Sequence, residues 1–306
     1  MAVRPVRLLA IGDVAWDILV RPERELVWGS DVFGAVELMP GGAAANVAVW
    51  AQRLGARATL VGKVGADTLG ELMLRHLRDE GVTTRIAEVA DLPTLRIGIV
   101  IDPQGEHGFV IDHTRPLTFS ADDLPTSLLD HADAVFFNGY AIFTSQSTEF
   151  LHPLLTAARR RQIPVAFDPS SFALIRAFGA ARLLDELGPL DVLLANSDEV
   201  KALCGDAPPS SLHTWTKLLV MKQGADGAAA YRAGESWCDS AVPVPVVDTT
   251  GAGDAFDAAF LVEWLGGGSV ERALAEGNRL GAHVARHMGA QAAATDATTS
   301  GPTPRA

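Results

Sequence analysis

Cysteines, basic residues and long apolar runs are all scarce in this chain, and each shortage excludes a class of protein. Cys204 and Cys238 are the only cysteines in 306 residues. Two cysteines are too few for a disulfide framework and no spacing resembles a zinc site, so we expect both to be small buried apolar side chains. The 25 lysines and arginines against 37 acidic residues give a net charge of -12. That balance argues against nucleic acid or an anionic membrane as the main partner.

The sequence also lacks the apolar run of about 18 residues that a membrane-spanning helix requires. Residues 8–11 form a short apolar run after Arg4 and Arg7, as at the start of a signal peptide. Gly12 and Asp13 interrupt that run, and a first buried strand fits it better. We therefore expect a cytoplasmic protein.

What the chain does have is enough apolar residues for one large domain, since 48% are hydrophobic and 20% charged. We expect this domain to cover residues 1–290, and residues 291–306, rich in Ala, Thr, Pro and Gly, to form a disordered tail. Short apolar runs alternate with longer helical patterns, which predicts a parallel sheet with helices on its faces. The predicted strands are residues 8–11, 59–61, 134–138, 164–168, 192–196 and 218–222. The predicted helices are residues 43–54, 69–79, 147–161, 173–187, 255–265 and 270–288.

Three of the predicted strands end in a polar residue, namely Asn138, Asp168 and Asn196. In an open α/β sheet, ligands bind beyond the carboxyl ends of the strands. These side chains therefore either converge on one crevice or simply begin turns and cap helices.

Residues 94–112 break the alternation and predict a β-hairpin around the Pro/Gly turn at 102–106. Further strands are predicted between about 14 and 38. Such strands form a small sheet able to cover the crevice, and the exposed face of a covering sheet often becomes a dimer interface. Trp28 and Phe33 are candidates either for that interface or for ordinary packing.

The run DTTGAGD at residues 248–254 places two glycines where an apolar helix begins. The first N–H groups of a helix have no internal partner, so Gly251 and Gly253 predict a backbone cradle for a phosphate. A carboxylate repels a phosphate, so Asp254 fits a general base that takes a proton from an attacking hydroxyl. Alternatively, the stretch is a plain Gly-rich turn in which Asp254 complements the helix dipole.

A second glycine motif changes the interpretation. Residues 41–55 begin with Gly41-Gly42, continue through Asn46 and have an Ala-rich helical pattern. Together with residues 248–254, this segment resembles the two signatures of the PfkB (ribokinase-like) carbohydrate kinases, GG-x-x-x-N-x-A and DTTGAGD. Three further matches follow the family's order, at residues 62–70, 196–199 and 222–227. The GxxxxGK[ST] loop of Walker-type kinases is missing from the sequence.

The resemblance implies a ribokinase-like three-layer α/β sandwich with a mainly parallel central sheet and a small β-sheet lid. It implies ATP-dependent phosphorylation of a primary hydroxyl of a small sugar or sugar acid, with ATP and Mg²⁺ and, in several members, a monovalent cation such as K⁺. One alternative is a nucleoside kinase of the same fold, with Trp16 and Trp50 as candidates to line the base pocket. Another is a sugar-binding regulator without catalysis.

The resemblance also implies a role for each matched residue. Asp254 is the catalytic base, beside an anion hole formed by the amides of Gly251, Ala252 and Gly253. The sugar is bound by Asp17, Gly41, Gly42 and Asn46. The nucleotide is bound by Asn196, Glu199, Lys222, Gly224, Gly227 and Asn278. Glu199 either arranges Mg²⁺ through water or is only a first-turn helix acid, and Asp248 and Thr250 match the monovalent-cation positions.

Two departures from the family pattern concern the substrate. Ala43 and Ala44 stand where ribokinases commonly have Lys and Gly, which brings the chain nearer to fructokinase-like members. The segment at residues 113–116 replaces a G-A-N sequence found after the hairpin in many members. Within it, Arg115 either meets an acidic sugar or a phosphate, or is only a surface cation. The motifs therefore predict the reaction better than its substrate.

Overall fold

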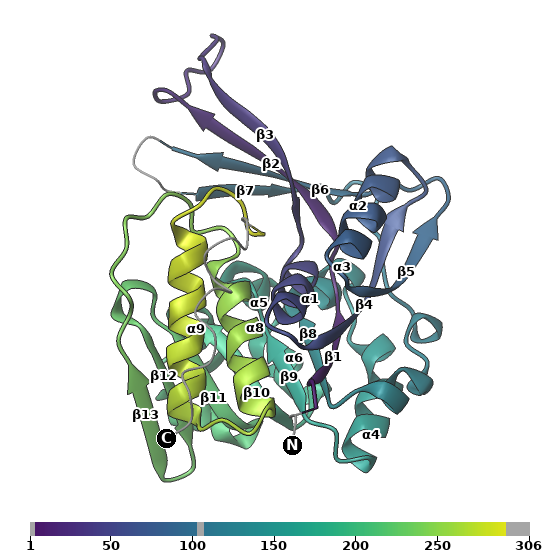
Figure 1. Ribbon diagram of the computed structural model, residues 1–306, viewed down its shortest axis with the longest axis vertical. Helices are drawn as coiled ribbons and strands as arrows, with labels where there is room; N and C mark the ends of the chain where they lie inside the picture. Colours follow the sequence, from purple (N-terminus) through teal and green to yellow (C-terminus); the bar gives the residue numbers. More distant parts are fainter. Residues whose placement is uncertain (1–3, 103–106, 292–306) are drawn as a thin grey trace.

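The centre of the molecule is a mainly parallel sheet of nine strands, in a computed structural model that describes residues 4–102 and 107–291 (Figure 1). The strand order is β13-β12-β11-β10-β9-β8-β1-β4-β5, with β12 and β13 antiparallel to their neighbours. The strands are β1 Arg7–Ile11, β4 Arg57–Gly65, β5 Thr83–Val89, β8 Ala134–Asn138, β9 Val165–Asp168, β10 Leu190–Asn196, β11 Thr216–Lys222, β12 Ala228–Arg232 and β13 Glu235–Asp239.

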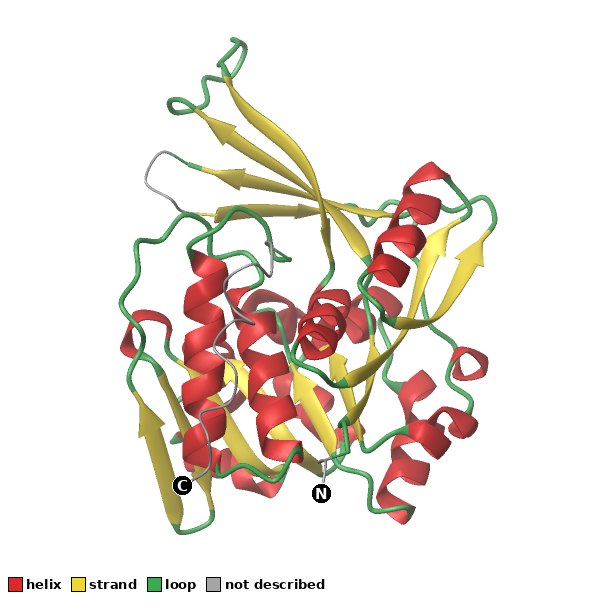
Figure 2. Cartoon of the chain, viewed as in Figure 1, coloured by secondary structure: helices red, strands yellow, loops and turns green. Residues whose placement is uncertain are grey.

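Helices cover both faces of this sheet (Figure 2). Alternate strand residues point to opposite faces, so Leu8 and Ala10 pack against α1, α2, α8 and α9, whereas Leu9 and Ile11 pack against α3 to α7. The predicted layered α/β fold is thus confirmed. The helices are α1 Ala43–Arg53, α2 Thr68–Asp79, α3 Gly139–Ser145, α4 His152–Arg160, α5 Phe172–Phe178, α6 Ala180–Leu187, α7 Ser197–Cys204, α8 Ala252–Leu265 and α9 Val270–Ala285.

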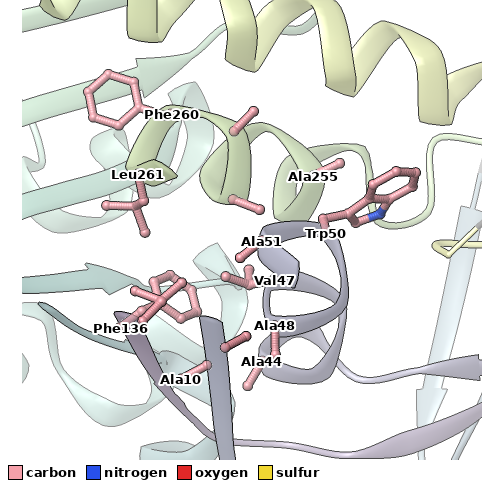
Figure 3. Close-up of a cluster of buried hydrophobic side chains, with 14 of the residues drawn as sticks. Ala10, Ala44, Val47, Ala48, Trp50, Ala51, Phe136, Ala255, Phe260 and Leu261 are labelled. Atoms are coloured by element: carbon pink, nitrogen blue, oxygen red, sulfur yellow. The ribbon is translucent and has the colours of Figure 1, made fainter. Parts of the chain in front are cut away.

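Helix α1 packs between the sheet and α8 (Figure 3). Ala44 and Ala48 lie beside Ala10 of β1, and Val47 and Ala51 lie toward α8. All of these side chains are buried. Because most of them are alanines, the three elements approach closely, and the start of α1 comes next to the start of α8.

A separate sheet of four strands lies across one end of the central sheet, and we call it the lid (Figure 1). Its order is β3-β2-β6-β7, with β2 and β6 parallel and the other pairs antiparallel. The lid also contacts the segment before α8, where Nη2 of Arg21 donates to the carbonyl of Val247 over 3.2 Å. The lid strands are β2 Ala15–Pro22, β3 Gly34–Gly41, β6 Leu95–Ile101 and β7 His107–Ile111. Residues 103–106 of the predicted hairpin turn lie outside the described residues.

Several local expectations were wrong. The helix predicted at 173–187 is divided into α5 and α6 at Gly179, whose φ of 100° ends the first helix. Cys204 is only half-buried at the end of α7, and Cys238 is exposed on the edge strand β13. Gln291 is buried rather than the first residue of a tail, and residues 292–306 lie outside the described part of the chain.

Across residues 4–102 and 107–291, none of the helices is long and apolar enough to cross a membrane. The cytoplasmic location stays a prediction.

Candidate functional site

The carboxyl ends of the central strands meet along one edge of the sheet, on the side of the lid (Figure 1). The strand register places Asn138 opposite Asp168, and Asn196 opposite Lys222. The three predicted crevice residues therefore share this edge. Asn138 and Asn196 also cap the helices that follow them, so the capping interpretation holds for these two residues, and a shared crevice stays a prediction.

Helix α8 begins after Gly251, which has a φ of 75°, a conformation that favours glycine. A Cβ at Gly251 would also collide with Ala290. The N–H of Ala252 donates to the carbonyl of Thr249 over 3.1 Å. This amide belongs to a turn in the described structure, and the predicted part of Ala252 in an anion hole stays a prediction. The amides of Gly251 and Gly253 are the other candidates.

Asp254 lies in the first turn of α8 and contacts Asn46 of α1, so the two glycine motifs meet here. Nδ2 of Asn46 donates to Oδ2 of Asp254 over 2.7 Å. Oδ1 of Asn46 accepts from Nε2 of Gln291 over 2.8 Å, and Oε1 of Gln291 lies 2.6 Å from Nε2 of His76. Burial raises the pKa of Asp254 to about 7, against the opposing effect of the Asn46 hydrogen bond. This carboxyl group therefore exchanges its proton near neutral pH.

Asp17 on β2 is a buried carboxyl group on the inner face of the lid. Gly41 makes room for it, because a Cβ at that position would overlap the carboxylate. Burial, followed by repulsion from Asp13 and Asp254, raises the pKa of Asp17 to about 8. A carboxyl group in these surroundings gains from ligands that donate hydrogen bonds, as sugar hydroxyls do.

Asp13 is a site residue that the sequence analysis missed. It accepts hydrogen bonds from the N–H groups of Ala43 (3.0 Å) and Ala44 (3.3 Å) at the start of α1. Nδ2 of Asn138 donates to it over 2.5 Å. Asp13 thereby fixes the glycine turn before α1, where Gly42 has a φ of 93°. The sequence did contain one signal for Asp13, since a polar residue just after the end of a buried strand lies at the edge of the sheet where ligands bind.

Lys222, at the end of β11, lies in a buried ion-pair cluster with two aspartates. Its Nζ is 2.7 Å from Oδ2 of Asp168 and 2.9 Å from Oδ1 of Asp257. Although burial opposes the charge, the two carboxylates raise the pKa of Lys222 and keep it protonated. A Cβ at Gly253 would lie 3.6 Å from Nζ. The structure therefore places this cation beside the start of α8, and the sequence analysis did not predict its two partners.

Asn196 and Glu199 form a reciprocal cap at the start of α7. The Asn196 side chain accepts from the N–H of Glu199 over 2.9 Å, and the Glu199 side chain accepts from the N–H of Asn196 over 2.8 Å. Burial, and then repulsion from Asp168, raises the pKa of Glu199 to about 7. Glu199 therefore is a first-turn helix acid, one of the two roles that the sequence left open. A nearby cation would stabilise the charged form of its carboxyl group.

Gly227 and Asn278 come together at the end of β13. Nδ2 of Asn278 donates to the carbonyl of Asp239 over 3.0 Å and to its Oδ2 over 2.8 Å. A Cβ at Gly227 would collide with the same carbonyl. Gly224, with a φ of 58°, lies in the same turn as Gly227. Three of the predicted nucleotide residues are therefore neighbours, whereas Lys222 belongs to the aspartate cluster.

The carboxylate of Asp248 is surrounded by donors. It accepts from the N–H groups of Thr250 (2.9 Å) and Gly289 (2.8 Å), and Nε2 of His107 in the lid lies 3.3 Å from its Oδ1. Despite burial, the contacts with His107, Thr250 and Gly289 lower the pKa of Asp248 to about 2. Oγ1 of Thr250 is buried beside this carboxylate.

Trp16 and Trp50, the candidates for a nucleoside pocket, are buried in the core. Their Nε1 atoms donate to the carbonyls of Leu69 (2.8 Å) and Ala290 (2.9 Å). Both indoles are therefore occupied by core packing and by these hydrogen bonds.

Comparison with known proteins gives four points of reference. The family model for pfkB family carbohydrate kinases matches residues 7–297. The chain is 31% identical over 293 residues to an ATP-dependent ribose-1-phosphate kinase of Halopiger xanaduensis, covering 95% of each protein. The adenosine kinase of Sinorhizobium meliloti has a TM-score of 0.82 at 23% identity, covering 94% of this chain and 96% of that one. A putative ribokinase II of E. coli in complex with ATP and Mg²⁺ has a TM-score of 0.80 at 21% identity, covering 94% and 95%.

Proposed function

Because the chain belongs to the pfkB family of carbohydrate kinases, we propose that it catalyses ATP-dependent phosphorylation of a primary hydroxyl of a small sugar or sugar acid. One observation carries this proposal. Asn46 of the first signature donates to Asp254 of the second, at a helix start that leaves the amides of Gly251 and Gly253 for a phosphate. A base and an anion site therefore share one edge of the sheet.

In the proposed reaction, Asp254 accepts the proton of the attacking hydroxyl while the phosphoryl group lies against the start of α8. The protonated Lys222 adjoins that position and offsets negative charge there. Asp17 binds other hydroxyls of the sugar, with Gly41 and Gly42 keeping the backbone open beside it. The lid excludes water from the acceptor.

We also propose where the nucleotide and its metal bind. The turn holding Gly224 and Gly227, with Asn278, forms the adenosine side. Glu199 and Asn196 act on Mg²⁺ through water, which suits an ion that gives up its waters reluctantly. When bound, Mg²⁺ would neutralise part of the negative charge on the phosphates of the nucleotide.

The family resemblance implies a monovalent-cation site at Asp248 and Thr250. The hydroxyl of Thr250 is buried and lies beside Asp248, whose pKa it helps to lower. The side chain of Asp248 does not fit, because its oxygens meet Thr250, Gly289 and His107. We therefore assign K⁺ no part in the proposed reaction.

An NADH-coupled kinase assay with ribose, fructose, 2-keto-3-deoxygluconate and adenosine tests the proposal against its alternatives. We expect turnover of at least one sugar or sugar acid. Turnover of adenosine alone would identify a nucleoside kinase, although the packed indoles of Trp16 and Trp50 argue against it. Sugar binding without turnover of any acceptor would indicate a regulator.

Replacing Gln291 with leucine is expected to lower kcat about 2- to 10-fold, since one hydrogen bond that orients Asn46 toward Asp254 is lost. The measurement is kcat for the preferred acceptor. In a double-mutant cycle, adding Gln291→Leu to Asn46→Leu should lower kcat no further, because Gln291 acts through Asn46. Independent, additive losses would contradict this role.

We further propose that the chain forms a homodimer through the outer face of the lid. Val36, Leu38 and Val110 are 68%, 49% and 70% exposed. The register places Ile18 opposite Leu38, and Val20 opposite Val36, so these apolar residues form adjacent rows on one flat face.

Replacing Leu38 with aspartate is expected to convert a dimer into a monomer, because it buries a charge in the proposed interface. Light scattering after size exclusion gives the mass. Leu72→Asp, at an exposed position on α2, serves as the control and should stay dimeric. A monomeric wild type, or a dimeric Leu38→Asp variant, would refute the proposal.

A further inference from the structure

A pocket lies between the end of β1 and the loop that follows the lid hairpin. Its lining includes Asp13, Lys63, Thr94, His113, Arg115 and Tyr140. Asp13 also accepts a hydrogen bond from the N–H of Ala43 at the start of α1, within the first signature. Burial, followed by Asp13 and Asp254, raises the pKa of Tyr140, so this side chain lies close to both carboxylates. The pocket is thus a neighbour of the Asp254 site.

The loop that carries Arg115 is held in place by Asp112. This carboxylate accepts from the N–H (3.2 Å) and Oγ1 (2.7 Å) of Thr114, and Nη2 of Arg96 donates to it over 2.5 Å. Pro116 restricts the backbone of Arg115 to extended conformations. Arg115 itself has no hydrogen bond or ion pair in residues 4–102 and 107–291. Arg115 is thus an exposed cation at the wall of the pocket, on a loop whose backbone is held in place.

Lys63 of β4 provides a second positive charge in the lining of the pocket. It is largely buried, pairs with Asp123 at 2.8 Å, and lies 5.8 Å from the ring of Phe119. An ammonium group has three donors, so the pair with Asp123 leaves donors for a ligand. The region around Asp254, by contrast, is acidic, with Asp13 and Asp17 beside it. An anionic group is attracted to the Arg115 side of the pocket and repelled from the Asp254 side.

We propose that the acceptor carries a negatively charged substituent, a phosphate or a carboxylate, which binds to Arg115 and Lys63 while the reacting hydroxyl lies at Asp254. This subsite rests on the proposed kinase function and narrows its substrate class to anionic sugars. The polarity of the pocket orients the acceptor, because only one of its ends is cationic.

The test compares kcat/KM for ribose 1-phosphate, 2-keto-3-deoxygluconate and ribose in the wild type, Arg115→Ala and Arg115→Lys. We expect Arg115→Ala to lower kcat/KM for the preferred anionic acceptor about 10- to 100-fold, as expected for a charge-assisted bond, and to leave ribose unaffected. Arg115→Lys should recover part of the loss. The preferred acceptor shows whether the substituent is a phosphate or a carboxylate. Arg57→Ala, exposed at the opposite end of β4, should change nothing.

Two results separate failure of this inference from failure of the kinase function. Equal use of ribose and the anionic acceptors, with Arg115→Ala unchanged on all of them, would overturn the inference and leave the kinase function intact. If no acceptor is turned over, the kinase function fails. Calorimetric titration with ribose 1-phosphate then tests the subsite. Weaker binding by Arg115→Ala than by the wild type would support the subsite. Equal binding by the two proteins, or no binding by either, would overturn it.

Discussion

Replacing Asp254 with asparagine is expected to lower kcat about 10²- to 10⁴-fold, the usual contribution of a general base. Asparagine has the same shape, so the amide of Asn46 still finds an oxygen at position 254. Sugar binding, measured by calorimetry, should therefore remain within a few fold of the wild type. Asp79→Asn, at an exposed site near the end of α2, is the matched control and should retain full activity.

The pH dependence follows from the same residue. Because burial raises the pKa of Asp254 to about 7, the base is protonated below that pH, and kcat/KM should fall as the pH drops through about 7. The hydrogen bond from Asn46 stabilises the charged form of Asp254 and so lowers the pKa of that carboxyl group. Asn46→Leu should therefore shift the acid limb of the profile to higher pH. Near-full activity of Asp254→Asn, or an acid limb unchanged by Asn46→Leu, would show that another group is the base.

Replacing Lys222 with methionine is expected to lower the free energy of unfolding by about 3 to 5 kcal/mol, the typical cost of removing one partner from a buried ion pair. The loss leaves Asp168 and Asp257 buried without their cation. Lys217→Met is the matched control on the same strand, since Lys217 pairs with Asp191 at 2.7 Å but is 76% exposed. That pair should contribute less than about 1 kcal/mol. Urea denaturation measures both.

A second variant keeps this prediction testable if Lys222→Met is too unstable to purify. Adding Asp257→Asn removes one uncompensated carboxylate and should restore part of the stability. Lys222 would be shown to have no structural role if Lys222→Met lost no more stability than Lys217→Met.

The central strands and long helices were predictable because their apolar patterns are regular over many residues. The strand β12 was missed because it contains Ala228, Ala229 and Ala230, and alanine is rare in strands. Helices α3 and α7 were missed because they are short, with seven and eight residues. Such segments owe their structure to packing against the sheet rather than to their own pattern.

The motifs located Asp254, the proposed base, and the glycine turns, because the glycine positions need particular backbone conformations and the motifs have a fixed spacing. They did not reveal Asp257 as a partner of Lys222, or Gln291 as a partner of Asn46. These pairs depend on how distant segments of the chain pack, and no local pattern encodes such packing.

The contacts around α1 bear on when the site forms during protein synthesis. Asn46 and Trp50 leave the ribosome early, but their partners, Gln291 and the carbonyl of Ala290, are among the last described residues. Until those residues emerge, Asn46 and the buried indole of Trp50 lack these partners. All nine strands of the central sheet are therefore synthesised before Asn46 and Trp50 can meet these partners.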